Sequence, residues 1–271
     1  MKPRHIVILF IGLMTTPPLL HGQTAPPSTP DTAATDKATQ DDPKLAALLK
    51  EGAMAILVEA DRRHTRWTDQ KLEVTMTTDK NRVLKLGIFN KGVNKRAIIF
   101  HEPANLRDMR IVIKGTEEIY AKIPGNRKAR RVAGHSRKQN LAGTQWDLQI
   151  GSMIRLAPFF EVKSMTQNAT DISMELVAKE GVDLNYPSVR VVIPRDTLTI
   201  RELSYRDESG TTLKVETRSD LWVKAGSYTY KKVLLTNAVT KEFTNIDVSE
   251  IVNDSGLKDS MFKKRWLERG M

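Results

Sequence analysis

One stretch of the chain decides how it folds. Residues 98–147 read IIFHEPANLRDMRIVIKGTEEIYAKIPGNRKARRVAGHSRKQNLAGTQWD. Short runs of alternating apolar and polar residues fill its first half, and a period of two predicts β-strands with one buried face. A strand over residues 117–123 ends at Pro124, arginines cluster after it, and the stretch closes on Gly-Thr-Gln-Trp-Asp. It predicts part of an antiparallel sheet and holds no catalytic constellation.

The same period of two extends on both sides of this stretch. Turn-forming groups such as Asp207-Glu208-Ser209-Gly210 separate the runs, as expected for hairpins. Residues 144–158 lack the alternation and predict a short helix or an irregular loop, and residues 257–267 predict a short basic helix. The pattern predicts a mainly β antiparallel meander, folded as a barrel or a strongly curved sheet. Strands are expected at 72–76, 83–88, 96–101, 109–114, 117–123, 129–133, 160–166, 171–178, 188–193, 198–206, 211–217, 220–224, 228–237 and 241–247.

The N-terminal region predicts export. Residues 1–22 join a basic start to an apolar run that is too short to span a bilayer, which is typical of a cleaved signal peptide. Residues 23–42 are rich in Pro, Thr, Ala and Asp and predict a disordered linker. Residues 43–271 then form a single domain. We expect the mature protein in the periplasm.

A helix is expected at the start of that domain. Asp42-Pro43 supplies an N-cap acceptor followed by proline at the first helical position. Helical spacing gives one apolar face, and the helix should end near residues 61–63. Gly52 lies inside it and should weaken it by about 1 kcal/mol relative to alanine. The apolar positions are Leu45, Leu48, Leu49, Ala53, Ile56 and Ala60.

Composition narrows the partners and argues against catalysis. The chain has 43 Lys and Arg against 32 Asp and Glu, which indicates an anionic partner, although export makes nucleic acid improbable. It has no cysteine. Beyond residues 1–22 the histidines, His64, His101 and His135, fall in separate elements without metal-ligand spacing. No nucleophile elbow or nucleotide-binding loop occurs. We therefore expect no enzyme, no metal and no cofactor.

The order of four short motifs resembles the outer-membrane lipoprotein-sorting protein family of the LolA-like superfamily. These motifs are Asp61-Arg62-Arg63; Phe100-His101-Glu102-Pro103 with the strand 109–114; Tyr120-Ala121-Lys122-Ile123-Pro124 with the basic run 128–132; and Gly143-Thr144-Gln145-Trp146-Asp147. The likeness covers residues 55–265. Gln145 departs from the family, which usually has an acid there.

The resemblance implies a half-open β-barrel around a hydrophobic cavity, with helices covering its open side. It also implies a periplasmic carrier or binding protein for lipid or acylated lipoprotein, with a link to an inner-membrane exporter of the resistance-nodulation-division type. Two alternatives stay open. One is a regulatory sensor that binds a protein partner through the basic hairpin, and the other is an envelope protein that binds polyanions.

Three sets of residues are candidates for the site. The inward positions of the strands could line a lipid-binding cavity, or they could be ordinary packed core: Leu72, Val74, Met76, Leu84, Leu86, Ile88, Ile111, Ile113, Ile119 and Ile123. The helix could act as a lid through Leu45, Leu48, Leu49 and Ile56. A basic stretch without acids could contact an anionic membrane surface or an acidic partner: Arg127, Lys128, Arg130, Arg131, Arg137 and Lys138. Lys263, Lys264 and Arg265 form a second basic group.

Overall fold

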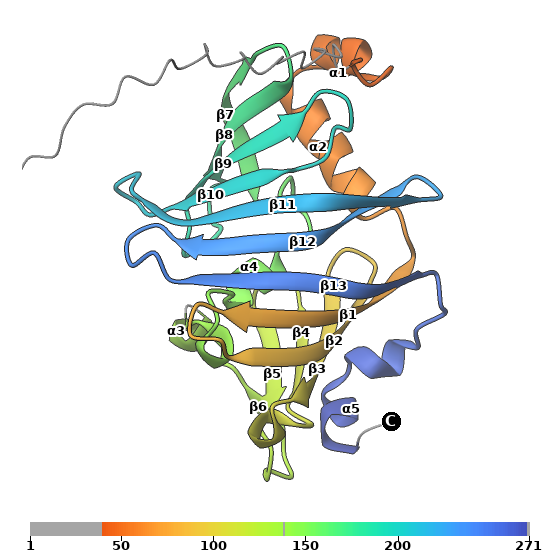
Figure 1. Ribbon diagram of the computed structural model, residues 1–271, viewed down its shortest axis with the longest axis vertical. Coiled ribbons are helices and arrows are strands. Elements are labelled where there is room, and N and C mark those ends of the chain that lie inside the picture. Colours follow the sequence, from red (N-terminus) through yellow and green to blue (C-terminus); the bar gives the residue numbers. More distant parts are fainter. Residues whose placement is uncertain (1–39, 138, 270–271) are drawn as a thin grey trace, which may run out of the picture. The chain divides into compact units, whose positions relative to one another are not determined.

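The computed structural model, which describes residues 40–137 and 139–269, shows one sheet of 13 antiparallel strands (Figure 1). The sheet is curved and stays open, which confirms the predicted mainly β architecture. These residues belong to the unit Thr39–Met271. The predicted signal peptide, residues 1–22, and all but the end of the predicted linker lie outside the described residues. No helix within the described ranges is long and apolar enough to cross a membrane.

The first and last strands of the chain pair at the centre of the sheet. The strand order is β6-β5-β4-β3-β2-β1-β13-β12-β11-β10-β9-β8-β7, so β6 and β7 are its two edges. The strands are β1 (Asp69–Thr78), β2 (Val83–Lys91), β3 (Lys95–Glu102), β4 (Arg110–Lys114), β5 (Glu118–Lys122), β6 (Arg130–Arg131), β7 (Phe160–Gln167), β8 (Asp171–Ala178), β9 (Ser188–Pro194), β10 (Glu202–Arg206), β11 (Thr212–Lys224), β12 (Ser227–Asn237) and β13 (Phe243–Asn253).

One segment joins the two edges by running across a face of the sheet. Residues 139–159, here called the crossing segment, contain the 3-10 turn η2 (Leu141–Gly143) and the short helix α4 (Leu148–Ser152). The helical turn α3 (Gly134–Arg137) precedes it. Leu141, Trp146 and Ile150 of this segment belong to the same buried cluster as the inward residues of the strands. The crossing segment therefore covers the face that carries the main core.

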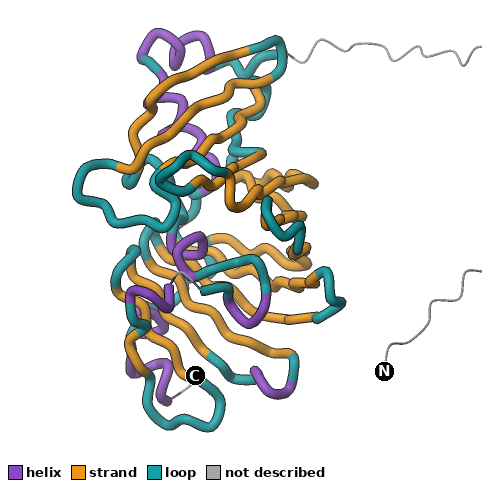
Figure 2. The backbone as a smooth tube through the Cα atoms, turned by 90° about the vertical axis from the view of Figure 1, so that its left-hand side faces the viewer, coloured by secondary structure: helices purple, strands orange, loops and turns teal. Residues whose placement is uncertain are grey.

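The two faces of the sheet carry separate cores, because neighbouring strand residues point to opposite sides. Ile88 and Ile98 join the main core, whereas their neighbours Phe89 and Ile99 join a second, smaller one. The second core lies under the C-terminal 3-10 turn η3 (Asp259–Phe262) and helix α5 (Lys264–Arg269). The short basic helix expected over 257–267 is therefore present, but it begins only at Lys264. The short turn η1 (Ala104–Leu106) links β3 to β4. Figures 1 and 2 show the N-terminal helix α1 and α5 at opposite ends of the sheet.

The expected single N-terminal helix is in fact two helices, α1 (Leu45–Glu51) and α2 (Ala53–His64). Gly52 separates them with φ 104° and ψ 172°, a conformation that is essentially restricted to glycine. Gly52 therefore breaks the helix, where the sequence predicted only a weakening. Asp42 accepts a hydrogen bond from the Lys44 amide at 2.9 Å, just before α1 begins.

Two further strand predictions were wrong in detail. The expected strands 211–217 and 220–224 form one strand, β11, that continues through Asp220 with a φ of 57°. The expected strand 198–206 exists only as β10, from Glu202. Leu198 has a φ of 46°, and the amide of Ile200 donates to a histidine side chain, so residues 198–201 form a loop despite their alternation.

Candidate functional site

A cavity of about 220 Å³ lies between the crossing segment and the central strands. One wall comes from β1 to β3 and β10 to β13, the opposite wall from the crossing segment, and the rim from the end of α2. The lining combines polar and apolar side chains. Its apolar part includes Leu72, Val74, Met76 and Ile88; Val233, Leu235, Ile246 and Val248; and Trp146, Ile150, Met153, Ile154 and Leu156.

A row of polar side chains crosses the sheet at one end of this lining. Strand register places Asn253, Gln70, Asn90 and Arg96 side by side on β13, β1, β2 and β3. Arg96 Nε donates to Asn90 Oδ1 at 2.7 Å, and Asn90 Nδ2 donates to Gln70 Oε1 at 3.3 Å. Gln70 Nε2 donates to Asn253 Oδ1 at 3.1 Å. We call these four residues the polar row.

Apolar rows follow the polar row along the same face. Leu72 and Ile88 pair in the next inward position, and Val74 pairs with Leu86 in the one after it. Side chains on one face of a strand recur every second residue, so Leu72 is the next inward residue of β1 after Gln70. This face of the sheet therefore changes from polar to apolar between Gln70 and Leu72. On β1 and β2 the cavity thus has an apolar floor that ends at the polar row.

Arg96 is the cation of the polar row. A terminal nitrogen, Nη1, donates to the carbonyl of Gly151 in α4, and Nε donates to Asn90. Burial lowers the pKa of Arg96 to about 10, so the guanidinium is charged at neutral pH. The other arginine of the lining, Arg218, is already paired, because its Nε lies 2.6 Å from Oε1 of Glu216.

His64 fastens the end of α2 to the sheet. Its Nε2 accepts the amide of Ile200 at 3.1 Å, and its Nδ1 lies 3.2 Å from the carbonyl of Tyr228. Only a neutral ring protonated at Nδ1 satisfies both contacts. Burial, aided by the charge of Arg218, lowers the pKa of His64 to about 3. His64 is therefore a neutral structural residue at the cavity rim.

Asp61 fastens the same helix to the crossing segment. Its carboxylate accepts the amides of Leu156, at 2.9 Å to Oδ2, and of Ala157, at 2.8 Å. Burial raises the pKa of Asp61 to about 6, although these amide bonds favour the charged form. Arg155 also donates to Thr65 at 2.7 Å. The end of α2 and the crossing segment therefore form one connected wall.

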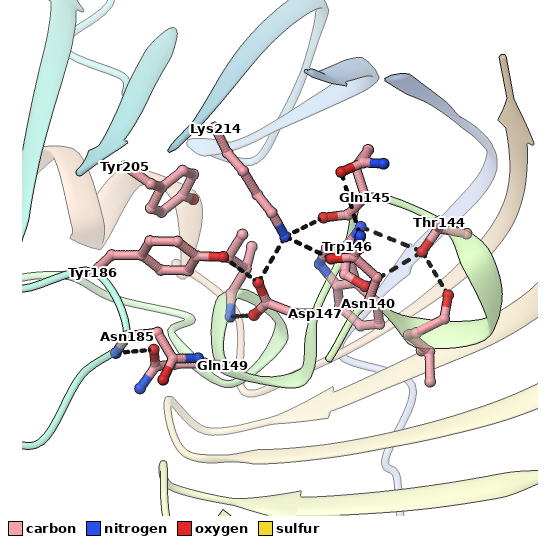
Figure 3. A network of polar contacts seen from close by, with 12 residues as sticks. Asn140, Thr144, Gln145, Trp146, Asp147, Gln149, Asn185, Tyr186, Tyr205 and Lys214 are labelled. Carbon is pink, nitrogen blue, oxygen red and sulfur yellow. Dashed lines mark hydrogen bonds and ion pairs between the residues drawn. The ribbon is translucent and has the colours of Figure 1, made fainter. Parts of the chain in front are cut away.

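Residues 144–147 of the Gly143–Asp147 motif are buried, and Figure 3 shows their contacts. Lys214 Nζ of β11 lies 2.9 Å from Asp147 Oδ2, and Tyr186 donates to the same oxygen at 2.6 Å. The other oxygen of Asp147 accepts the Ile150 amide at 2.8 Å and so caps α4. The amide of Gln145 donates to Thr244 of β13 at 2.8 Å. The motif thus anchors the crossing segment to the sheet.

Trp146 forms part of the cavity wall and lies against Gly151. A Cβ atom added at Gly151 would lie 2.5 Å and 2.8 Å from two carbons of the Trp146 ring. Glycine is required here by this close approach. The Trp146 indole can occupy its place in the cavity wall because Gly151 has no side chain.

The structure places the predicted cavity residues in three groups. Leu72, Val74, Met76 and Ile88 line the cavity. Five others are fully buried in the main core on the same face: Leu84, Leu86, Ile111, Ile113 and Ile119. Ile123 follows the end of β5 and is 54% exposed. The predicted lid residues Leu45, Leu48, Leu49 and Ile56 pack on the main core, and the part of α2 that reaches the cavity begins at Asp61.

The predicted basic residues lie around the β6 edge, apart from the cavity. Arg127, Lys128, Arg130 and Arg131 are exposed, and Arg137 donates to the carbonyl of Thr116 at 2.7 Å. Lys138 lies outside the described residues. A second group of basic residues, Lys263, Lys264 and Arg265, lies beside the first, because α5 packs beside β5. The amide of Ala129 donates to Glu268 at 3.2 Å, and Lys264 Nζ lies 5.9 Å from the centroid of the Tyr120 ring. We call the two groups together the basic edge.

Sequence reasoning missed the polar row and the buried Lys214–Asp147 pair. Gln70 and Asn90 could have been noticed, since each continues the inward alternation of a strand with a polar residue where an apolar one is expected. Arg96 and Asn253 carry no such local signal. In the described ranges, no group of three or more His, Cys, Asp or Glu side chains could hold a metal ion.

A family profile described as "-like: Uncharacterized protein" matches residues 92–269. The chain belongs to this family. A comparison with the curated proteins finds no match. The matched range runs from the end of β2 to α5, so it includes the crossing segment and both partners of the Lys214–Asp147 pair.

Three solved structures share the fold. A DUF1329 family protein from Desulfovibrio piger has a TM-score of 0.72 at 19% identity, with 83% of this chain and 99% of that chain covered. A putative outer membrane lipoprotein-sorting protein domain from Vibrio parahaemolyticus has a TM-score of 0.70 at 16% identity, covering 80% and 98%. A LolA superfamily protein from Nitrosomonas europaea has a TM-score of 0.67 at 16% identity, covering 79% and 98%. The resemblance found in the sequence is thus confirmed at the level of the fold.

Proposed function

We propose that the protein is a non-catalytic periplasmic carrier or binding protein for lipid or an acylated protein. The observation that carries this proposal is the cavity with an apolar floor under the crossing segment, in a fold shared with a lipoprotein-sorting protein domain. Burying an acyl chain is favourable by about 0.8 kcal/mol for each methylene. The predicted signal peptide supports the periplasmic location. A role beside an exporter is a further part of the proposal and draws on the family resemblance.

The size of the cavity implies that it widens when it is filled. Its volume of about 220 Å³ is below the roughly 300–1,000 Å³ of typical ligand pockets. The sheet wall is fixed by strand pairing, whereas the opposite wall is held by side-chain contacts of Asp61 and Asp147. The crossing segment and the end of α2 are therefore the parts expected to move. The predicted lid residues Leu45, Leu48, Leu49 and Ile56 would act only through the end of α2.

The test is binding of a fluorescent fatty acid and native mass spectrometry of the mature protein from a bacterial periplasm. Leu72→Trp places a large side chain in the cavity, and Leu234→Trp makes the same change at a position that is 40% exposed on β12. We expect co-purifying or added lipid on the unchanged protein and on Leu234→Trp, with at least tenfold weaker binding for Leu72→Trp. Equal binding by both variants, or no uptake by the unchanged protein, would overturn the proposal.

The basic edge favours an anionic surface or partner as a second component of this function. Exposed cations from two distant parts of the sequence meet there, and a polybasic group near an anionic membrane contributes about 1 kcal/mol for each residue. A carrier must dock where its ligand is delivered or collected. A sensor that binds an acidic protein through the same residues is the alternative.

A further inference from the structure

The polar row gives the cavity a chemical direction. At one end of the floor stand Asn253, Gln70, Asn90 and Arg96, and the neighbouring inward positions on β1 and β2, Leu72 and Ile88, are hydrocarbon. A ligand that fits both parts has a polar head and an apolar chain. Its head would lie at the polar row and its chain over the apolar rows.

The hydrogen bonds of the polar row all run in one sense. Arg96 donates to Asn90, Asn90 to Gln70, and Gln70 to both Asn253 and Thr229. Each amide oxygen in this chain is thus occupied by its neighbour. The side-chain oxygens of the polar row are thus used as acceptors within the row, and Arg96 is the charged group of the row that has donors left over.

Arg96 has spare capacity for an anion. A guanidinium carries five N–H donors, and those of Arg96 that bond within the described residues go to Asn90 and to the Gly151 carbonyl. Both acceptors are neutral, and among the described residues Arg96 forms no ion pair. Burial lowers the pKa of Arg96, and the carboxylate of Glu216 raises it in part through its charge, without forming an ion pair with Arg96. Because a half-buried charge without a direct ion-pair partner is costly, a bound anion would be favoured here. Arg218 differs, since Glu216 already neutralises it at 2.6 Å.

We propose that the ligand carries an anionic group, a carboxylate or a phosphate, at the head of its acyl chain, and that Arg96 binds this group. The inference rests on the proposed function, because it assumes that an acyl chain occupies the apolar floor. Arg96 then determines specificity, and an amphiphile with a neutral head binds more weakly. A charge-assisted hydrogen bond in an enclosed site corresponds to about ten- to a hundredfold in affinity.

The test compares palmitic acid labelled with a fluorophore at its far end with the methyl ester of the same molecule. Both are titrated at pH 7.5, below the concentrations at which they aggregate. We expect the unchanged protein to bind the acid at least tenfold more tightly than the ester. Arg96→Met should bind the two equally, whereas Arg190→Met, the same change on β9 at an exposed arginine, should keep the preference.

A second variant covers the case in which Arg96→Met fails to fold. Asn90→Asp places a carboxylate where Arg96 Nε already donates at 2.7 Å, with almost no change in shape. It should remove the preference by supplying the missing counter-ion. Equal binding of acid and ester by the unchanged protein, or a preference that survives in Arg96→Met and in Asn90→Asp, would overturn the inference and leave the proposed function standing. Failure to bind either probe would overturn the proposed function itself.

The source of the anion is settled by competition. Palmitate and lysophosphatidic acid are each used to displace the bound fluorescent acid, with monoacylglycerol as the neutral competitor. Displacement by palmitate alone identifies a fatty acid, and stronger displacement by lysophosphatidic acid identifies a phospholipid head. Displacement by monoacylglycerol as strong as that by palmitate would contradict a role for Arg96 in recognition.

Discussion

The ammonium of Lys214 on β11 lies 2.9 Å from the carboxylate of Asp147, and both side chains are buried. Lys214 belongs to the sheet and Asp147 to the crossing segment, so the ion pair joins the two. Lys214 also donates to the Gln145 carbonyl at 2.7 Å and to Asn140 Oδ1 at 2.9 Å. One cation thus holds three points of the crossing segment in place.

Lys214→Met should therefore destabilise the protein strongly. Removing one partner of a buried ion pair leaves the other charge uncompensated and typically costs about 3–5 kcal/mol. Urea denaturation measures the free energy of unfolding. The control is Lys232→Met on β12, where an exposed pair with Asp247 at 3.7 Å contributes about 0–1 kcal/mol. Similar effects of the two changes would show that the buried pair does not hold the crossing segment.

Gly151→Ala should reshape the cavity wall. In a helix, alanine is more favourable than glycine by about 1 kcal/mol, so helix propensity alone would make this variant more stable. A loss of stability would therefore come from the contact between the new Cβ atom and Trp146. The expected loss is about 1–3 kcal/mol, as for overpacked cores, together with a change in tryptophan fluorescence. Trp146→Phe in the same chain should relieve part of the loss. An alanine variant as stable as the unchanged protein, with the same fluorescence, would contradict this account of the wall.

The polar row shows what could not be derived from the sequence. Alternation correctly indicated a strand around Leu72, Val74 and Met76, because a period of two is local information. It could not pair residue 70 with residue 253, since that register depends on the meeting of the first and last strands. The same holds for Lys214 and Asp147, which are 67 positions apart. Gly52 was judged by propensity alone, although its φ of 104° ends the helix.

His64 makes the stability of the protein depend on pH. Its pKa is lowered to about 3 in the folded protein from 6.5, so below pH 6.5 the unfolded chain binds a proton that the folded chain does not. Stability from this residue is complete above pH 6.5 and falls by at most about 1.4 kcal/mol per pH unit down to pH 3. Asp61, with its pKa raised to about 6, acts in the opposite sense between pH 6 and 3.8.

The variant His64→Gln isolates the histidine, because Asp61 is present in both proteins and its effect cancels in the difference. At pH 7.5 the variant should be less stable by about 1–3 kcal/mol, through the lost bonds to Ile200 and Tyr228. The difference should shrink at pH 5. Urea denaturation at the two pH values measures it, and a difference that stays constant would show that His64 is not held neutral.

The basic edge should bind anionic vesicles. Flotation with phosphatidylglycerol vesicles at low salt should recover the protein, and 0.5 M salt should release it, because exposed charges are screened. Changing Arg130 and Arg131 to Glu, or Lys263 and Arg265 to Glu, should weaken binding in both cases. The control reverses Lys163 and Lys224, which are exposed elsewhere on the sheet. Equal recovery with phosphatidylcholine vesicles would contradict an electrostatic contact.

The pairing of β1 with β13 has a consequence for the order in which the protein is assembled. Strands β1 to β6 and β7 to β13 are two series of hairpins, each with neighbours close in sequence, and such local pairings form early. The two series meet where β1 pairs with β13, the first strand to be synthesised with the last. This pairing can therefore form only when the whole chain is available. A chain shortened before Phe243 should lose protection from hydrogen exchange at the amides of β1 that bond to β13, whereas the amides of β1 that bond to β2 should stay protected.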